Sequence, residues 1–365
     1  MHPVLEQLAE QGQSIWYDNI RRGMLTDGAM QALIDDGLVG VTSNPTIFEK
    51  AINESNDYDD ELPTLIAAGK SKEEIYDAVT IADIAATADL FRPVYDRTAG
   101  GDGYVSIEVS PRLAYDAGAT ISEARRLFKT LGRSNVMIKI PGTAQGLSAI
   151  ETAISEGINV NVTLIFSTNV YTQIMHAYMK GLERFIDAGN DPANVASVAS
   201  FFVSRVDTAV DRQIEDRPAL ADLMGKAAVA NSKLAYQRFL EEFSGDRFGA
   251  LRAKGARVQR PLWASTSTKN PDYSPTLYVD TLIGPDTVNT VPPATLDAIR
   301  AGIPVDATVT ENPDQARDVI TRLEEAGVSM SQVTEALCTA GVQAFADSFD
   351  KLLAAIESKR QAAAP

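Results

Sequence analysis

Cysteine and histidine are both scarce in this chain of 365 residues, and their scarcity argues against several kinds of chemistry. The one cysteine, Cys338, has no partner for an intramolecular disulfide and argues against a thiolate metal site. Its neighbours in residues 333–338 have a helical pattern, so we interpret it as a core cysteine and not as a nucleophile. The two histidines, His2 and His176, give little support to histidine-based hydrolysis or to a zinc site.

Basic residues are also outnumbered, with 33 Lys and Arg against 49 Asp and Glu and a net charge of −16. Such a balance argues against nucleic acid and anionic membranes as partners. No apolar run approaches the length of a membrane span. Residues 1–6 have neither the basic start nor the apolar core of a signal peptide. We therefore expect a cytoplasmic protein that does not associate with membranes.

Short runs rich in β-branched residues alternate with longer helical patterns, which is typical of repeated βα units and a parallel sheet. We predict eight strands, and hence a (β/α)8 barrel that forms one domain over residues 1–365. The interval from Asn44 to Glu108 is long enough for extra helices, and residues 331–364 should form a helical tail that covers part of the barrel. The predicted strands are 14–19, 39–43, 104–109, 136–140, 158–166, 195–203, 260–265 and 287–291.

Lys139 lies in the middle of the apolar fourth strand, which a Pro-Gly turn then ends. A lysine is almost never fully buried without a reason, because burying an ammonium costs several kcal/mol unless it loses its proton. A neutral amine is a nucleophile toward carbonyl groups and can form a Schiff base. The alternative is an edge-strand lysine whose amine reaches water.

Other polar residues interrupt or end the predicted strands in the same manner. In a parallel barrel, alternate strand residues point inward and catalytic residues gather at the carboxyl ends of the strands. Glu108 lies inside an apolar strand, and Asn161 and Thr163 share one face of theirs. The other candidates at or just after strand ends are Asp18, Asn44, Ser200, Phe202, Arg205 and Lys269.

Each of these residues also has an ordinary structural explanation. Asp18 could cap a helix, and Asn44 could be a turn residue. Arg205 could pair with Asp207 on a helix surface, and Lys269 could be solvated. Together, however, they place one amine, two carboxylates, two amides and a cationic pair at matching strand ends, which structure alone explains poorly.

A further basic run has the simpler explanation. Arg252, Lys254, Arg257 and Arg260 precede or begin the seventh strand, and we predict that they form a solvated face.

Several motifs around these candidates resemble the transaldolases, most closely the longer bacterial type. The resemblance extends from about Ser14 to about Pro293, and the segments around Lys139 and Asn161 are highly specific. The motifs are Gly40-Val-Thr-Ser-Asn-Pro-Thr-Ile-Phe48, Ser106-Ile-Glu-Val109, Ile138-Lys-Ile-Pro-Gly-Thr143, Ile158-Asn-Val-Asn-Val-Thr-Leu-Ile-Phe-Ser167 and Ser200-Phe-Phe-Val-Ser-Arg205.

The resemblance implies a role for each catalytic candidate. Lys139, on the predicted fourth strand, matches the Schiff-base lysine of the family. Glu108 matches the acid/base that acts through a water molecule, which Thr163 helps to hold. Asp18 matches the residue that handles the proton of the hydroxyl next to the cleaved bond.

The resemblance also implies how the substrate is bound. Asn44 and Asn161 match the amides that bind the dihydroxyacetone unit, and Ser200 and Arg205 match phosphate contacts. Lys269 stands where many family members have a second phosphate-binding arginine. A lysine supplies a point charge there and not a bidentate fork.

The implied activity is transfer of a dihydroxyacetone unit between sugar phosphates in the non-oxidative pentose phosphate pathway. The iminium on the lysine serves as the electron sink, so we expect no metal and no cofactor. The partners would be small sugar phosphates, with no nucleic acid, and the protein would be a monomer or homodimer.

Two other functions stay open at this point. One is a fructose 6-phosphate aldolase, but such enzymes carry Gln and Tyr where this chain has Glu108 and Phe202. The other is a non-catalytic barrel, which the intact set of Asp18, Glu108 and Lys139 argues against.

Overall fold

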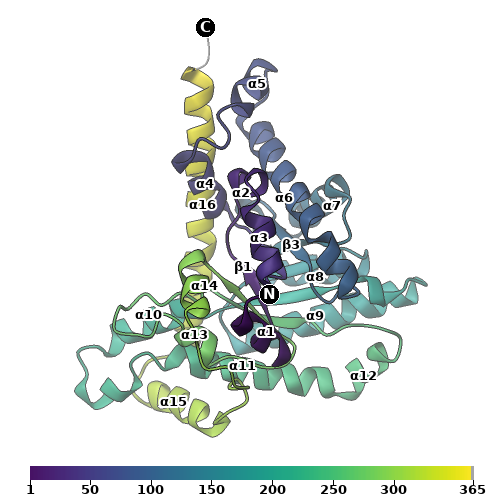
Figure 1. Ribbon diagram of the computed structural model, residues 1–365. Helices are drawn as coiled ribbons and strands as arrows, with labels where there is room; N and C mark the ends of the chain where they lie inside the picture. Colours follow the sequence, from purple (N-terminus) through teal and green to yellow (C-terminus); the bar gives the residue numbers. More distant parts are fainter. Residues whose placement is uncertain (363–365) are drawn as a thin grey trace.

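Eight parallel strands form a closed barrel in the computed structural model, which describes residues 1–362 (Figure 1). The strands pair in chain order, and the last pairs with the first. The predicted (β/α)8 barrel is therefore confirmed. The strands are β1 Gln13–Tyr17, β2 Gly40–Thr42, β3 Tyr104–Glu108, β4 Val136–Pro141, β5 Val160–Ile165, β6 Ser197–Phe202, β7 Arg260–Ala264 and β8 Thr287–Val291.

The predicted strands match these within two residues at each end. The largest differences are at β1, β5 and β6, and at β5 and β6 apolar flanking residues lengthened the prediction. The amide of Ile158, for example, donates to the carbonyl of Ala153 and so belongs to the end of the preceding helix rather than to the sheet. Apolar sequence predicts burial here but does not say which backbone groups pair.

Helices connect the strands and surround the barrel, and the long connection between β2 and β3 contains three of them, as predicted. The α-helices are α1 Pro3–Glu10, α2 Arg22–Thr26, α3 Ala29–Asp36, α4 Pro45–Glu54, α5 Glu61–Ala67, α6 Lys72–Arg97, α7 Ala117–Leu131, α8 Ala144–Ser155, α9 Thr168–Asp187, α10 Ser204–Ile214, α11 Ala227–Ser244, α12 Asp246–Arg252, α13 Leu277–Asp280, α14 Pro293–Arg300, α15 Pro313–Glu325 and α16 Met330–Ala362. Short 3-10 helices are η1 Pro111–Leu113, η2 Pro192–Asn194 and η3 Pro218–Leu223.

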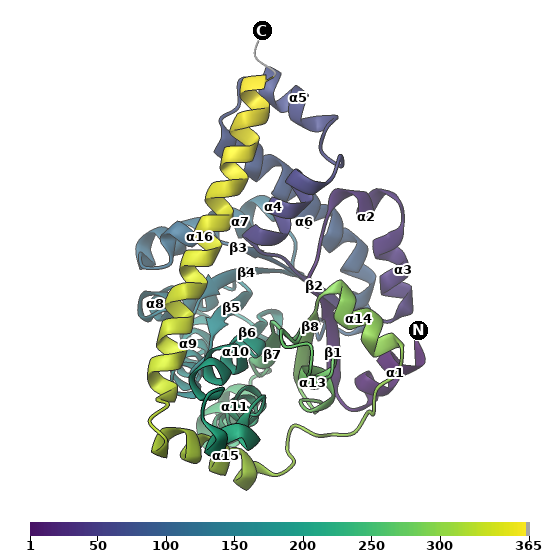
Figure 2. The same cartoon turned by 90° about the vertical axis from the view of Figure 1, so that its left-hand side faces the viewer.

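The C-terminal helix α16 corresponds to the helical tail predicted for residues 331–364, of which 363 and 364 lie outside the described residues. It runs along one side of the barrel beside α4 (Figure 2). It packs against α4, α6, η1 and α10, and of these α4, η1 and α10 each follow the carboxyl end of a strand. Thr46 Oγ1 donates to Ser348 Oγ at 2.9 Å, and Arg112 forms an ion pair with Asp350. Among residues 1–362 no helix, α16 included, is long and apolar enough to cross a membrane.

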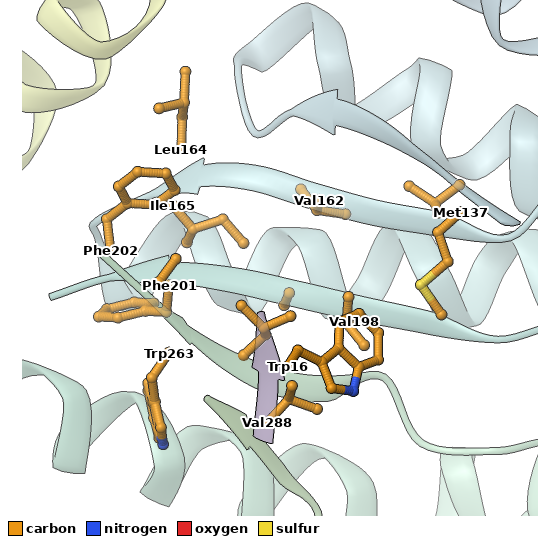
Figure 3. Close-up of a cluster of buried hydrophobic side chains, with 14 of the residues drawn as sticks. Trp16, Met137, Val162, Leu164, Ile165, Val198, Phe201, Phe202, Trp263 and Val288 are labelled. Atoms are coloured by element: carbon orange, nitrogen blue, oxygen red, sulfur yellow. The ribbon is translucent and has the colours of Figure 1, made fainter. Parts of the chain in front are cut away.

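Large apolar side chains fill the barrel and the space between its strands and the outer helices (Figure 3). Trp16, Met137, Val198 and Val288 are each at most 2% exposed. A Cβ atom at Gly40 would lie 2.6 Å from the indole ring of Trp16, so this position of β2 requires glycine. The indole ring of Trp16 can pack here only because Gly40 has no side chain.

Arg260 corrects the prediction of a solvated basic face. Its side chain is only 17% exposed, and its guanidinium donates to Ser14 Oγ at 2.6 Å and to Asp102 Oδ1 at 3.2 Å. Asp102 also accepts hydrogen bonds from Ser14 Oγ and from Trp16 Nε1. This network ties β7 to β1 and to the loop before β3 at the amino end of the barrel. The sequence could not reveal it, because the partners are more than 150 residues away.

Cys338 lies in α16. It is half-buried and packs against the hydrophobic core, whereas the sequence pattern predicted a core residue. Burial still raises the pKa of its thiol, which keeps it in the less reactive protonated form.

Replacing Arg260 with methionine should destabilise the barrel while keeping most of the side-chain volume. The change removes all five hydrogen bonds of the guanidinium and leaves the Asp102 carboxylate partly unpaired, so we expect a loss of about 1–3 kcal/mol or more in the free energy of unfolding. Urea titration measures it. Arg238→Met is the control, since the Arg238–Glu241 pair is exposed and should contribute less than about 0.5 kcal/mol. Equal losses in the two variants would contradict a special role for the network.

Candidate active site

Three polar side chains from neighbouring strands lie side by side inside the barrel. Glu108 of β3 pairs in register with Lys139 of β4, and Lys139 pairs in register with Asn161 of β5. They are 6%, 4% and 0% exposed. Because directly paired residues of a parallel sheet point to the same side, the register places the three groups at one level of the barrel.

The amine of Lys139 is buried but has few partners. Nζ donates to the backbone carbonyl of Ser43 at 2.9 Å and lies 3.4 Å from Glu108 Oε2. The aromatic ring of Phe345, from α16, lies over it with its centroid 5.9 Å from Nζ. The amine therefore has a carbonyl and a carboxyl group close by and an aromatic ring beyond them.

The carboxyl group of Glu108 is buried, and neither of its oxygens has a hydrogen-bond partner within the protein. Burial raises the pKa of this carboxyl, and the nearby charge of Lys139 offsets the rise only in part. Its protonated form therefore persists to higher pH than that of an exposed glutamate. An oxygen pair without partners in such a place is suited to hold a water molecule or a substrate hydroxyl.

Asp18 follows β1 and faces the same space. Its backbone amide donates to the carbonyl of Val291, and Thr42 Oγ1 donates to its Oδ1 at 2.7 Å. Burial also raises the pKa of this carboxyl, while Lys139 and the Thr42 hydroxyl oppose the shift. Asp18 caps no helix, since the residue before α2 is Arg21. The structural alternative for Asp18 is thus wrong.

The two candidate amides are held in different ways. Asn161 donates to Ser106 Oγ at 3.1 Å and accepts from Ser200 Oγ at 2.7 Å, so its orientation is set by neighbours on β3 and β6. Asn44 accepts from the amide of Ile47 at 3.0 Å and so caps the N-terminus of α4. Asn44 also borders the cavity described below, so its capping role and a binding role are compatible.

An irregularity in β5 shapes the next part of the site. The register with β6 shifts between Val162 and Ile165, and Leu164 has a φ of 59°. Thr163 Oγ1 is buried without a hydrogen-bond partner, while Leu164 points away from the core cluster in Figure 3. A Cβ atom at Gly341 of α16 would lie 2.8 Å from Leu164 Cδ2. The bulge thus aims Thr163 inward and Leu164 at the C-terminal helix.

Cationic side chains gather at the wider part of the site. Arg205, in the first turn of α10, lies with its guanidinium 5.4 Å from the ring centroid of Phe202. Arg205 pairs with no carboxylate in the described part of the chain, and the predicted alternative partner, Asp207, is buried and accepts from Tyr278 instead. Desolvation lowers the pKa of Arg205. This cation is free to bind an anionic ligand.

Lys269 follows β7, and its amine donates to Ser267 Oγ at 2.6 Å. Burial lowers the pKa of its ammonium group, and the charges of Arg205 and Lys50 lower it further. Lys50, on α4, therefore lies near enough to act on Lys269, and no sequence argument had singled it out. A cluster of three cations in a protein of net charge −16 is well suited to a phosphate group.

A cavity of about 310 Å³ joins these groups at the carboxyl end of the barrel. Of the predicted site residues, all border it except Glu108 and Asn161, which contact Lys139 and Ser200 from behind. Within residues 1–362 no group of three or more Asp, Glu, His or Cys side chains could hold a metal ion. The cavity residues are Asp18, Thr42, Asn44, Thr46, Ile47, Lys50, Lys139, Thr163, Ser200, Phe202, Arg205, Ala264, Ser265, Ser267, Lys269, Thr290, Pro292 and Phe345.

Sequence reasoning missed two residues of this cavity that carry distinctive chemistry. Lys50 lies six residues after Asn44, so its helical position could have suggested it. Phe345 had no signal of its own, because one apolar residue in a long helix normally packs on a neighbour.

Comparison with known proteins agrees with this arrangement. The family model described as Transaldolase/Fructose-6-phosphate aldolase matches residues 15–356, which extends beyond the resemblance found in the motifs. A protein named Transaldolase from Thermobifida fusca is 49% identical over 358 aligned positions that cover 97% of each chain. Transaldolase 2 from Nostoc sp. is 45% identical over 375 aligned positions, which cover 99% of this chain and 98% of the relative.

A third relative, named Transaldolase, from Parafrankia sp., is 46% identical and aligns over the full length of both chains. The barrel, the buried lysine beside a carboxyl group and these full-length similarities agree. The chain belongs to the transaldolase/fructose-6-phosphate aldolase family.

Proposed function

We propose that this protein acts as a transaldolase. It would transfer a dihydroxyacetone unit from sedoheptulose 7-phosphate or fructose 6-phosphate to glyceraldehyde 3-phosphate or erythrose 4-phosphate. One observation carries the proposal: the buried amine of Lys139 lies 3.4 Å from the Glu108 carboxyl, in a cavity that three cations also border. The relatives named transaldolase support it.

In this reaction the neutral amine of Lys139 attacks the C2 ketone of the donor. Loss of water from the resulting carbinolamine gives an iminium, which accepts the electron pair when the C3–C4 bond breaks. Because the amine is buried among few polar groups, little water competes for it. The proposal therefore makes Lys139 the nucleophile.

Glu108 would move protons in the steps that lose and regain water. Its oxygens lack hydrogen-bond partners within the protein, and burial raises its pKa, so it can hold a proton for a water molecule at higher pH than an exposed glutamate can. The unpartnered hydroxyl of Thr163 could hold the same water. These observations support the assignment that the family motifs suggest.

Asp18 would take the proton of the C4 hydroxyl as the C3–C4 bond breaks. Its raised pKa suits a general base that must also return the proton to the acceptor aldehyde in the second half of the reaction. Asn44 and Asn161 would bind the hydroxyls of the dihydroxyacetone unit. The fixed orientation of Asn161 between two serines supports this role.

Phosphate binding falls to Arg205, supported by Ser200, Lys269 and Lys50. The cation–π contact with Phe202 holds the guanidinium in place without neutralising it. The alternative activity within the family is simple cleavage, as in a fructose 6-phosphate aldolase. The presence of Glu at 108 and Phe at 202 favours transfer.

An assay of transfer tests the proposal, with Glu108→Gln as the informative variant. The wild-type protein should form erythrose 4-phosphate and sedoheptulose 7-phosphate from fructose 6-phosphate and glyceraldehyde 3-phosphate. Glutamine can position a water but cannot relay its proton, so the variant should be slower by about 10²–10⁴-fold. Coupled detection of erythrose 4-phosphate, with direct detection of free dihydroxyacetone, measures both products.

Residual activity of Glu108→Gln should shift toward release of dihydroxyacetone. If wild-type protein only cleaves fructose 6-phosphate and never forms the seven-carbon product, the transaldolase proposal fails. If Glu108→Gln transfers at the wild-type rate, Glu108 is a structural carboxyl group.

Replacing Arg205 with alanine should weaken binding of phosphorylated substrates. A charge-assisted contact contributes about 1.5–3 kcal/mol, so KM for glyceraldehyde 3-phosphate should rise roughly tenfold or more. Lys50→Met and Lys269→Met should each raise it by less than about fivefold, since exposed charges contribute less. Steady-state kinetics with phosphorylated and unphosphorylated glyceraldehyde separates the phosphate contribution from other effects.

Arg212→Ala is the matched control, because it removes an exposed arginine from the same helix. It should leave both KM values unchanged. A loss for Arg205→Ala that is equal for the two aldehydes would show that Arg205 does not bind the phosphate.

A further inference from the structure

The C-terminal helix contributes one side chain to the site, the aromatic ring of Phe345. This ring is 5% exposed, borders the cavity and lies over the amine of Lys139. The other near neighbours of the amine, the Ser43 carbonyl and the Glu108 carboxyl, are polar. Of these three neighbours of the Lys139 amine, Phe345 is the apolar one.

The position of Phe345 is set by contacts one turn before and one turn after it on the same face of α16. One turn earlier, Gly341 packs closely on Leu164, which the bulge in β5 turns toward the helix. One turn later, Phe349 packs edge-on against Tyr76 of α6, with ring centroids 5.1 Å apart. The helix is therefore held on both sides of the ring, and the ring is held over the amine.

Transfer imposes a requirement that cleavage does not. After the aldose phosphate leaves, the three-carbon fragment stays on Lys139 as an enamine until an acceptor arrives. Water can end this state: the enamine carbon takes up a proton, and water adds its oxygen to C2 of the resulting iminium. The water gives up one proton as it adds, which balances the proton taken up by the carbon. Its second proton passes to the nitrogen as the C2–N bond breaks with its electron pair, so free dihydroxyacetone leaves a neutral lysine. No other reactant is needed.

We propose that Phe345 is a specificity-determining residue that shields the covalent fragment on Lys139 from water and so favours transfer over release. This proposal rests on the proposed transaldolase function. A bulky apolar ring beside the reacting carbon occupies space that water would otherwise fill, and it offers that water no hydrogen bond.

The test compares Phe345→Ala with Phe349→Ala. The two residues lie one turn apart on α16, are 5% and 6% exposed and lose the same ring, but only Phe345 borders the cavity. With fructose 6-phosphate and glyceraldehyde 3-phosphate, the ratio of free dihydroxyacetone to transfer product should rise severalfold for Phe345→Ala. It should rise much less for Phe349→Ala, because the ring at 345 is intact and the helix is still held by the Gly341–Leu164 packing and by the Thr46–Ser348 hydrogen bond. Phe345→Leu, which keeps apolar bulk, should restore most of the wild-type ratio.

The outcomes separate the failure of this inference from failure of the proposed function. Equal ratios for wild-type protein and a folded, active Phe345→Ala variant would overturn the shielding role while leaving transaldolase activity intact. Equal increases in the two alanine variants would overturn it too, since they would point to a loosened helix. If Phe345→Ala does not fold, Phe345→Gln keeps part of the bulk but offers water a hydrogen bond, and an unchanged ratio in that variant would overturn the proposal.

Discussion

The close approach of a buried amine and a buried carboxyl group is the interaction on which the rest of this site depends. Lys139 and Glu108 lie 3.4 Å apart with almost no exposure, in register on adjacent strands. Burial of two ionisable groups is costly, and their mutual attraction offsets the cost only with good geometry. The barrel supplies that geometry through backbone pairing, which no single side-chain change alters. The core around Trp16 and the network of Arg260 hold the opposite end of the same strands.

The remaining parts of the site come from segments outside the barrel strands. Helix α4, which Asn44 caps, places Lys50 at the cation cluster. Helix α10 holds Arg205 in its first turn. Helix α16 joins α4 through Thr46 and Ser348 and lays Phe345 over the amine. In the proposed mechanism the strands would position the reacting groups. Helices α4 and α10 and the loop after β7 would supply the cations for the phosphate, and α16 would supply the apolar cover. Such a division of roles would let one barrel combine covalent chemistry with recognition of a charged substrate.

Most of the fold and much of the candidate site could be predicted from the sequence. Alternating apolar runs and helical periods predict the barrel because they report local burial, and a polar residue such as Lys139 within an apolar strand signals a special position. Contacts between distant segments left no such signal: Arg260 looked solvated, Lys50 looked like a helix-surface lysine, and Phe345 looked like ordinary packing. The single domain over residues 1–365, the cytoplasmic location, the roles of the site residues and the monomeric or homodimeric state stay predictions.

The central claim is that substrate becomes bound to Lys139, and chemical trapping tests it most directly. Borohydride added to the protein with fructose 6-phosphate reduces a Schiff base to a stable amine, and peptide mapping by mass spectrometry then locates it. The account predicts one three-carbon adduct, on Lys139, and none in the Lys139→Met variant. An adduct on another lysine, or turnover by Lys139→Met, would contradict it.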